Sequence, residues 1–265
     1  MAYKLIAIDM DDTLLSDEFR MPVAVKDAIA QAVAQGVIVT IATGRMYSSA
    51  LPYVKDLGLD IPIITYNGAL VKEAISGQIV NHRPVPSRIV KEIIDLADKE
   101  EWHLNLYLND KLYVNKLGAE SEFYEEIAGI EALLIDDFLE VSSQPSTKVL
   151  VISKDARQAD EISKVLQNKF SEELNITKSK PRFIEIMQKG VSKGIALAEL
   201  AADLGIKKSE IIAIGDSLND LEMIQYAGLG VAVANAASEV KERADYITKS
   251  NEEAGVAEVI KKFVL

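Results

Sequence analysis

The sequence is poor in the residues that carry thiol, redox and histidine chemistry. It contains no cysteine, which excludes disulfides, thiolate nucleophiles and cysteine-ligated zinc or iron–sulfur clusters. Its two histidines, His82 and His103, both fall near or within a segment that we predict to be a separate inserted domain, which argues against a histidine metal site. A dinucleotide-binding fingerprint is absent as well, because Gly228 and Gly230 are followed by Val233 where the third glycine would stand.

Positive charge is also scarce, and long apolar runs are missing. Lys and Arg number 29 against 41 Asp and Glu, a net charge of -12, so we expect no nucleic-acid partner. No apolar stretch reaches the roughly 18 residues of a membrane-spanning helix. Residues 1–4 lead directly into the first predicted strand, and we expect a cytoplasmic protein with no membrane partner. The choice between monomer and homodimer stays open.

Hydrophobic residues, by contrast, make up 49% of 265 residues, enough for one large domain or two modest ones. Residues 5–8 form an unbroken apolar run, which is typical of a strand buried on both faces of a parallel sheet. The run ends at three acids, Asp9, Asp11 and Asp12. Like charges this close remain ionised together only at a cost unless a cation balances them. Because ligands bind at the carboxyl ends of such strands, the stretch predicts a metal site, with a solvated acidic turn as the alternative.

Strands and helices alternate in the first and last thirds of the chain, which predicts a parallel α/β sheet. The predicted strands are residues 5–8, 37–42, 63–65, 211–214, 229–233 and 246–248. The helices between them lie at about 22–35, 46–57, 193–204, 221–226 and 237–244, with another at the end of the chain. Ser192 is the expected cap of the helix that ends at Gly205.

The middle of the chain has a different character. Pro84 and Pro86 flank a boundary, and leucines that alternate with other residues in 104–108 predict a sheet with one wet face. The other expected elements are helices at about 89–100, capped by Ser87, 120–128 and 156–174, and strands at 148–152, 176–178 and 183–187. We therefore predict a discontinuous catalytic core, residues 1–83 and 189–265, with an inserted α+β domain at 84–188.

Polar groups follow four of the predicted core strands. They are Asp9 with Asp11, Thr43, Asn67, and Asp216 with Asn219 and Asp220. An oxygen-rich and nitrogen-poor site of this kind suits Mg²⁺ rather than zinc. Mg²⁺ in proteins keeps few carboxylates, several waters and often a substrate phosphate, so the pattern indicates phosphoryl chemistry.

These motifs as a set resemble those of the haloacid dehalogenase (HAD) superfamily. The matching residues are Asp9-Met-Asp11-Asp12-Thr13, Thr43, Lys193 and Gly215-Asp216-x-x-Asn219-Asp220. Further segments, and the place of the insert, are similar to the Cof-type sugar phosphatases: Thr43-Gly44-Arg45, Tyr66-Asn67-Gly68-Ala69 and Lys193-Gly194. The resemblance implies a doubly wound, Rossmann-like core with an inserted cap domain. Asp12 departs from it, because many relatives have glycine there, and we predict no catalytic role for this acid.

The resemblance also implies roles for single residues. Asp9 would be the nucleophile and a ligand of Mg²⁺, and Asp11 the general acid and base, with its backbone carbonyl a second ligand. Asp216 would complete the protein ligands, and Lys193 would offset phosphoryl charge, its alternative being a solvated lysine in a first helical turn. Thr43 would offer its hydroxyl and backbone N–H to a phosphoryl oxygen.

Six further residues have two interpretations each or only a supporting role. Gly44 and Arg45 are candidates for binding the substrate, Arg45 either by gripping a second anionic group or as a surface residue. Asn219 and Asp220 contact the phosphate or support its ligands, and Asn67 supports the site or only forms a turn. Glu185 either faces the cleft or, as we prefer, is structural.

The predicted function is Mg²⁺-dependent hydrolysis of small phosphorylated metabolites, foremost sugar phosphates, through an aspartyl-phosphate, with the inserted domain as a cap that excludes water and selects the substrate. A phosphomutase on the same core is one alternative. A phospho-acceptor signalling or binding module is another, but such modules normally lack an acid two residues after the phosphorylated aspartate, so Asp11 favours the enzyme.

Overall fold

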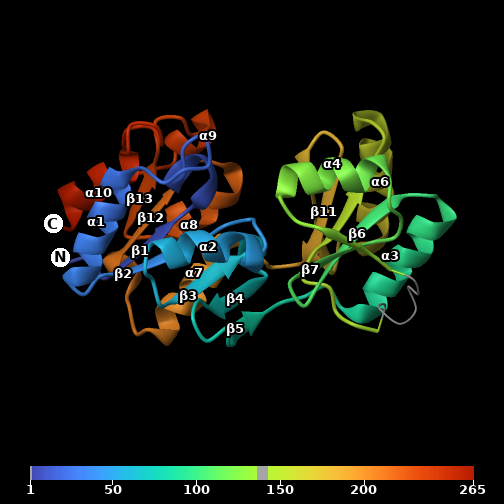
Figure 1. Cartoon of the computed structure of the whole chain (residues 1–265), viewed down its shortest axis with the longest axis horizontal. Helices are drawn as coiled ribbons and strands as arrows, with labels where there is room; N and C mark the ends of the chain where they lie inside the picture. The colour runs from blue at the N-terminus through green and yellow to red at the C-terminus, as the bar shows by residue number, and fades with distance from the viewer. Residues whose placement is uncertain (1, 136–142) are drawn as a thin grey trace. The chain divides into compact units, whose positions relative to one another are not determined.

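The computed structural model describes residues 2–135 and 143–265. The chain divides into two compact units, the first formed by Met1–Asn81 with Ser192–Leu265 and the second by His82–Val191 (Figure 1). Within the described ranges, none of the helices has the length and apolar character needed to cross a membrane. The functions of the units as catalytic core and cap stay predictions.

The described part of the first unit contains a parallel five-stranded sheet, as the alternation predicted. Its order is β14-β13-β12-β1-β2, formed by β1 (Leu5–Ile8), β2 (Ile38–Ile41), β12 (Ile211–Gly215), β13 (Leu229–Ala232) and β14 (Tyr246–Ile247). The central strand β1 is aligned with β12 and β2 so that Leu5 pairs with both Ile211 and Ile38. All four residues of β1 are buried, which explains its unbroken apolar sequence.

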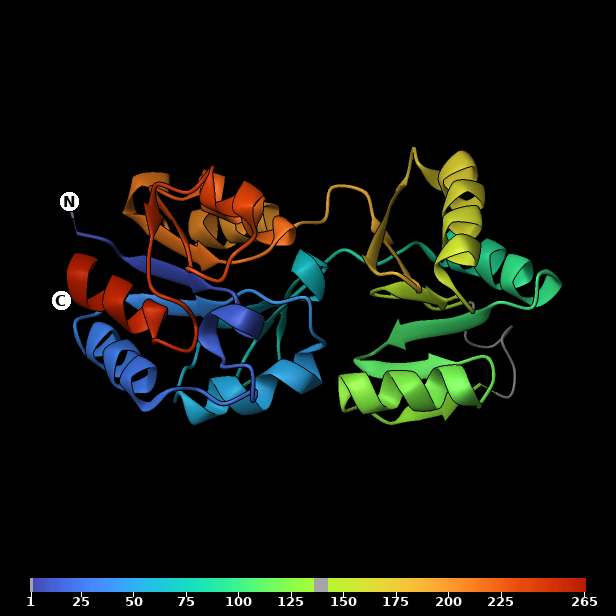
Figure 2. The ribbon, with the colours of Figure 1, turned by 90° about the horizontal axis from the view of Figure 1, so that it is seen from above.

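Helices cover both faces of this sheet, which is the doubly wound arrangement (Figure 2). On one face lie α1 (Val23–Ala34) and α10 (Gly255–Phe263), which contact each other. On the other face α7 (Lys193–Asp203) and α8 (Leu221–Tyr226) bury alanine, leucine and methionine side chains against β1 and β12. The other α-helices in the described part of this unit are α2 (Tyr47–Asp56) and α9 (Ser238–Lys241). The carboxyl ends of the parallel strands therefore share one edge of the sheet.

The strand predicted at residues 63–65 is not an ordinary member of the parallel sheet, which corrects the expectation. It is β3 (Pro62–Thr65), and it pairs antiparallel with β4 (Leu70–Glu73), which with β5 (Ile79–His82) completes a second sheet. A single parallel bridge, Ala42 to Ile64, joins β3 to the end of β2. The prediction missed β4 and β5 because half of the residues of β4 and all of those of β5 are at least partly exposed, so neither strand is an unbroken apolar run.

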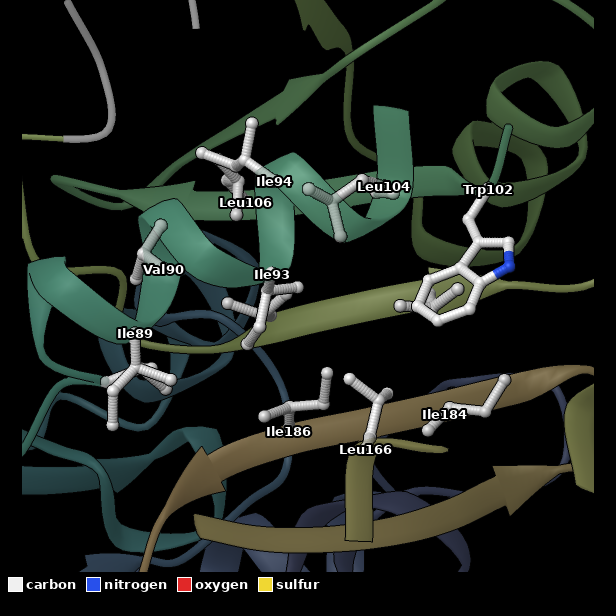
Figure 3. Close-up of a cluster of buried hydrophobic side chains, with 14 of the residues drawn as sticks. Ile89, Val90, Ile93, Ile94, Trp102, Leu104, Leu106, Leu166, Ile184 and Ile186 are labelled. Atoms are coloured by element: carbon white, nitrogen blue, oxygen red, sulfur yellow. The ribbon is translucent and has the colours of Figure 1, made fainter. Parts of the chain in front are cut away.

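The described part of the second unit forms one sheet with the order β10-β11-β9-β6-β7-β8. The strands are β6 (His103–Leu108), β7 (Lys111–Val114), β8 (Ala132–Leu134), β9 (Val149–Ile152), β10 (Leu174–Lys180) and β11 (Phe183–Gln188). Two helices, α3 (Ser87–Lys99) and α6 (Ala156–Phe170), pack on one face and form an apolar core with it. Figure 3 shows Ile93 of α3 and Leu166 of α6 among the side chains of this core.

At β6 the other face of this sheet is not wet, which corrects a second expectation. All six residues of β6 are buried, including His103 and Asn105. The helix α4 (Ala119–Ala128) contributes Tyr124, whose hydroxyl hydrogen-bonds that of Tyr107 and whose ring lies 5.7 Å from that of Phe183. The alternation in the sequence thus separates an apolar core from a buried layer that contains polar groups, not from water.

Of the two serines predicted to cap helices, one does so and the other does not. Ser192 caps α7 as predicted, because its Oγ accepts a hydrogen bond from the Ile195 N–H at 3.1 Å. Ser87 is not a cap, since α3 already begins at this residue after Pro86. The helix predicted to reach residue 174 ends at Phe170, and β7 and β8 were not predicted.

Candidate active site

Three buried aspartates meet at the carboxyl edge of the parallel sheet. Asp9 follows β1 and Asp216 follows the adjacent β12, and the Asp9 N–H donates to the Ile214 carbonyl at 2.9 Å. One carboxylate oxygen from each of Asp9, Asp216 and Asp220 lies within 4.8 Å of the others. The topology therefore brings together acids that are more than 200 positions apart in the sequence, and the solvated-turn alternative does not apply to Asp9.

Lys193 inserts its ammonium group between two of these carboxylates. Its Nζ donates to Asp9 Oδ1 at 2.5 Å and to Asp220 Oδ1 at 2.7 Å, and its side chain is 1% exposed. Burial alone would lower the pKa of Lys193, but Asp9 and Asp220 outweigh it, so the pKa is raised well above its ordinary value. The two ion pairs favour the charged form of this lysine in the first turn of α7, and its burial excludes the solvated alternative.

The charges of the cluster do not balance. Burial raises the pKa of Asp9 most strongly, Asp220 and Asp216 add to the rise, and Lys193 opposes it, so the pKa lies well above its ordinary value. Burial also raises the pKa of Asp216, against the hydrogen bonds of the Ser217 and Thr13 hydroxyls. When all three carboxylates are ionised, they and the one ammonium leave two negative charges in a buried space, which fits a divalent cation bound by oxygen ligands.

The three acids are not equally suited to hold a metal. Asp220 is fully buried, its Oδ1 accepts from Lys193, and its Oδ2 accepts the N–H groups of Asp216 at 3.1 Å and Ser217 at 3.0 Å. These bonds shape the loop that carries Asp216. Gly215 is required next to it, because a Cβ there would lie 2.6 Å from that of Asp220. Asp9 and Asp216 are therefore the stronger metal candidates, and Asp220 has the supporting contacts.

Asp11, a predicted metal ligand and proton carrier, is not part of this cluster among the described residues. Its carboxylate instead receives hydrogen bonds from Arg45 Nε, at 3.0 Å to Oδ1 and 2.9 Å to Oδ2. The structure therefore pairs the Arg45 guanidinium with a carboxylate of the protein itself. The predicted ligation through the Asp11 carbonyl stays a prediction.

The loop after β2 places Thr43 and Gly44 beside these groups, with one correction. The Thr43 N–H donates to the Ile64 carbonyl at 2.9 Å, so it is engaged and does not serve a phosphoryl oxygen as predicted. The Thr43 Oγ1 accepts from the Arg45 N–H at 3.1 Å, which leaves the hydroxyl proton for a ligand. Gly44 lies against Asn67, whose Oδ1 would be 3.1 Å from a Cβ at that position.

Sequence reasoning underestimated the turn formed by Tyr66, Asn67 and Gly68. All three residues have positive φ angles, of 51°, 54° and 101°. The Asn67 N–H donates to the Thr43 carbonyl at 3.0 Å, and its Oδ1 accepts from Asn219 Nδ2 at 2.9 Å. A Cβ on Gly68 would overlap the Ser192 carbonyl. The turn therefore contacts the segments that carry Thr43, Asn219 and Lys193, and only its Asn-Gly pair is visible in the sequence.

Two other acids lie outside this arrangement. Asp12 is exposed and adopts a left-handed conformation, φ 57°, which explains why glycine suits this position. Glu185 lies in the second unit, where its Oε1 is 3.5 Å from Lys148 Nζ and both side chains are largely buried. That pairing agrees with a structural role for Glu185.

The fold and the site define a class: a doubly wound α/β enzyme core with acidic loops after two adjacent strands and a buried lysine between them. The family model of haloacid dehalogenase-like hydrolases matches residues 6–260, and the chain belongs to this family. Its sequence relatives and structural neighbours identify it as a Cof-type member and as a phosphoric monoester hydrolase.

Three similar proteins illustrate the relationship. The putative phosphatase YxeH of Bacillus subtilis is 35% identical over 271 residues, covering 99% of both chains. The 5-amino-6-(5-phospho-D-ribitylamino)uracil phosphatase YcsE of the same organism is 36% identical over 262 residues, covering 99% of this chain and 96% of the relative. The solved structure of the HAD subclass IIB sugar phosphatase BT4131 superposes with a TM-score of 0.81 at 26% identity, covering 98% of both chains.

Proposed function

We propose that this protein is a Mg²⁺-dependent phosphatase that hydrolyses small phosphorylated metabolites, foremost sugar phosphates, through an aspartyl-phosphate on Asp9. The observation that carries the proposal is the buried group of Asp9, Asp216 and Lys193, which has more negative than positive charge and stands where parallel strands end. Such a site suits a dianionic phosphate only when a cation completes it.

The residues of the chain account for both halves of the reaction. The Asp9 oxygen that Lys193 does not hold attacks phosphorus, and the bond from phosphorus to the ester oxygen breaks. The leaving oxygen keeps the electron pair and takes a proton from Asp11. Water then attacks phosphorus and gives a proton to Asp11, while the bond between Asp9 and phosphorus breaks and releases phosphate. Each residue ends the cycle as it began.

Asp9 and Asp216 would hold Mg²⁺ directly, and Thr13 and Ser217 orient Asp216 through hydrogen bonds of 3.1 and 2.7 Å. When bound, the ion supplies positive charge that offsets the charge on the transferring phosphoryl group. Lys193 adds a fixed positive charge beside the nucleophile. Asp220 keeps that lysine in place by accepting its second hydrogen bond.

The substrate class rests on the relatives. The name of YcsE specifies a phosphate on a ribityl chain, and BT4131 is named as a sugar phosphatase. A phosphate monoester of a sugar or related polyol is therefore the favoured substrate. Asp11 separates this function from a stable phospho-acceptor module, because an acid two residues from the nucleophile can activate the water that discharges it.

The test is steady-state hydrolysis of p-nitrophenyl phosphate and a panel of sugar phosphates, with and without Mg²⁺. We expect metal-dependent release of phosphate, and a loss of about 10³-fold or more in kcat for Asp9→Asn. Asp60→Asn, at an exposed acid outside the site, is the matched control and should retain full turnover. Absence of metal-dependent turnover in the wild type, or full turnover in Asp9→Asn, would contradict the proposal.

A further inference from the structure

The Asp11 side chain is more exposed than the buried aspartates of the cluster, although the proposed reaction requires it to transfer protons. It is 40% exposed, and it lies in a short loop where Asp11 and Asp12 both leave helical geometry. The neighbouring acids Asp9 and Asp12 carry charges of the same sign. Nothing in the loop itself would keep this carboxylate in one rotamer, because an exposed aspartate has free rotation about two side-chain bonds.

Arg45 supplies that constraint from the loop that follows β2. Its Nε lies between the two carboxylate oxygens, at 3.0 and 2.9 Å, and its Nη2 makes a further hydrogen bond to Oδ1. A planar guanidinium in this position fixes both the place and the tilt of a carboxylate. Oδ1 receives two of the bonds and Oδ2 one, so Oδ2 has more capacity left to hold or accept a proton.

The guanidinium is itself held on several sides. It lies over the rings of Phe19 and Tyr53, with 5.4 Å to each centroid. The backbone of Arg45 is fixed as well, because its N–H donates to Thr43 Oγ1 and its carbonyl accepts from the Tyr66 N–H at 2.9 Å. Its side chain is 21% exposed. Arg45 is thus fastened to the protein instead of extending freely toward solvent to meet a substrate anion.

We infer that Arg45 is a positioning residue: it holds the Asp11 carboxylate in the orientation that its proton transfers require, and does not bind the substrate. The inference rests on the proposed function, since it assumes that Asp11 carries the protons. It replaces the sequence-based idea that Arg45 grips a second anionic group. The inference also explains why the aromatic side chain of Phe19 lies exposed at this place, because its ring covers the guanidinium.

The inference predicts a dependence on the leaving group. An alkoxide leaves only if it is protonated, so a misplaced Asp11 slows its transfer strongly, whereas p-nitrophenolate is stable enough to leave without a proton. The kcat/KM value covers the steps up to transfer to Asp9, and it is the quantity to compare. We expect Arg45→Met to lower kcat/KM for β-glycerophosphate by about 10²-fold or more and for p-nitrophenyl phosphate by about tenfold or less.

Three variants make the test specific. Arg45→Lys keeps the charge but not the fork and should show the same selectivity for leaving groups. Phe19→Leu leaves Arg45 and Asp11 intact and should give a smaller loss in the same direction, which covers the case of an Arg45 variant that does not fold. Arg20→Met, at an exposed arginine near Phe19, is the matched control and should have no effect.

The experiment also separates positioning from binding. In an Asp11→Asn background, Arg45→Met should change kcat/KM for either substrate by less than about threefold, because the group it positions is gone. Equal losses on both substrates, or a rise in KM at constant kcat, would overturn the inference and assign Arg45 to substrate binding. Failure of the proposed function looks different, because the wild type itself would then show no Mg²⁺-dependent hydrolysis.

Discussion

Two buried lysines, one in each unit, show how a functional charge differs from a structural one. Lys193 contacts two carboxylates and has a third in the same cluster, so negative charge remains in excess. Lys148 faces the single carboxylate of Glu185, and the pair is neutral. In both cases burial would lower the pKa of the lysine, but acidic neighbours raise it instead. For Lys193 these are Asp9 and Asp220, and for Lys148 they are Glu185 and Tyr124. The balance of charge, not burial, distinguishes the two sites.

The hydrogen bonds of Lys193 are also shorter than the contact of Lys148 with its carboxylate. Lys193 has hydrogen bonds of 2.5 and 2.7 Å and begins a helix whose position the Tyr66–Gly68 turn fixes. Lys148 is 3.5 Å from Glu185 and lies over the Tyr107 ring, 4.8 Å from its centroid. A cluster with surplus negative charge requires a cation to balance it. A pair with balanced charges, such as Lys148 with Glu185, needs no further ion and can have a purely structural role.

The largest expected effect comes from removing each lysine in turn. Lys193→Met leaves three carboxylates without their counter-charge, and we expect kcat/KM to fall by about 10³-fold or more. Lys148→Met leaves only Glu185 unpaired, which costs about 3–5 kcal/mol in the free energy of unfolding but changes kcat/KM by less than about threefold. Steady-state kinetics below the unfolding transition and urea denaturation measure the two quantities.

A double substitution sharpens this comparison. Lys148→Met with Glu185→Leu removes both charges of the neutral pair, and its free energy of unfolding should return to within about 1–2 kcal/mol of the wild type. A loss of activity in Lys148→Met as large as that in Lys193→Met would contradict the comparison, because it would give the second lysine a part in the reaction.

Mg²⁺ and pH should both change the stability of the protein through the carboxyl groups of the first site. Because the folded-state pKa values of Asp9 and Asp216 are raised above those of the unfolded chain, the metal-free protein binds more protons when folded. Their contribution to stability is therefore full below the ordinary carboxyl range and is lost as pH rises through the raised values. Mg²⁺ competes with these protons. It should stabilise the protein by about 2.7 kcal/mol at a concentration 100 times its Kd near pH 8, and by less near pH 5.5 at the same concentration.

Thermal unfolding with and without Mg²⁺ measures this difference. Asp216→Asn should reduce the stabilisation strongly, and the Asp60→Asn control should retain it. A gain in melting temperature that is equal at both pH values, or larger in acid, would show that the cation does not bind at these carboxylates.

The smallest effect concerns the acid without a role. Asp12 has a φ of 57°. Partial desolvation of its largely exposed carboxyl, together with the charges of Asp11 and Asp17, raises its pKa, so both its backbone and its charge are unfavourable. We expect Asp12→Gly to raise the free energy of unfolding by about 1 kcal/mol and to change kcat/KM less than about threefold. Asp12→Ala removes the charge but keeps the strain, and urea denaturation of both variants separates the two causes. Destabilisation by glycine would contradict this explanation.

The sequence was most informative where a strand is short, apolar and followed by acid. Such strands predicted the parallel sheet, and the ends of β1 and β12 pointed to the edge where Asp9 and Asp216 meet. The expected cap at Ser192 led correctly to the first turn that carries Lys193. Local patterns sufficed here because burial and strand direction together determine where these residues lie.

Other features depend on contacts that no local pattern contains. The polar residues of β6 are buried because α4 covers them, and a period of two does not reveal what lies on the second face. The partner of Arg45 is Asp11, 34 positions away, so a guanidinium near a phosphate site suggested a substrate contact instead. For Asp220 the motif left open a phosphate contact or a supporting role, and only its three hydrogen-bond partners show that it shapes the loop.

The most direct test of the central claim is to trap the phosphorylated protein. Asp11→Asn should form the aspartyl-phosphate from p-nitrophenyl phosphate and discharge it slowly, because the base that activates water is missing. Mass spectrometry after acid quench, in the presence of Mg²⁺, should find one added phosphoryl group on the peptide that contains Asp9, and none when Asp9→Asn is added to the variant. A phosphoryl group on another residue, or sustained hydrolysis by Asp9→Asn with no phosphorylated protein, would contradict the account.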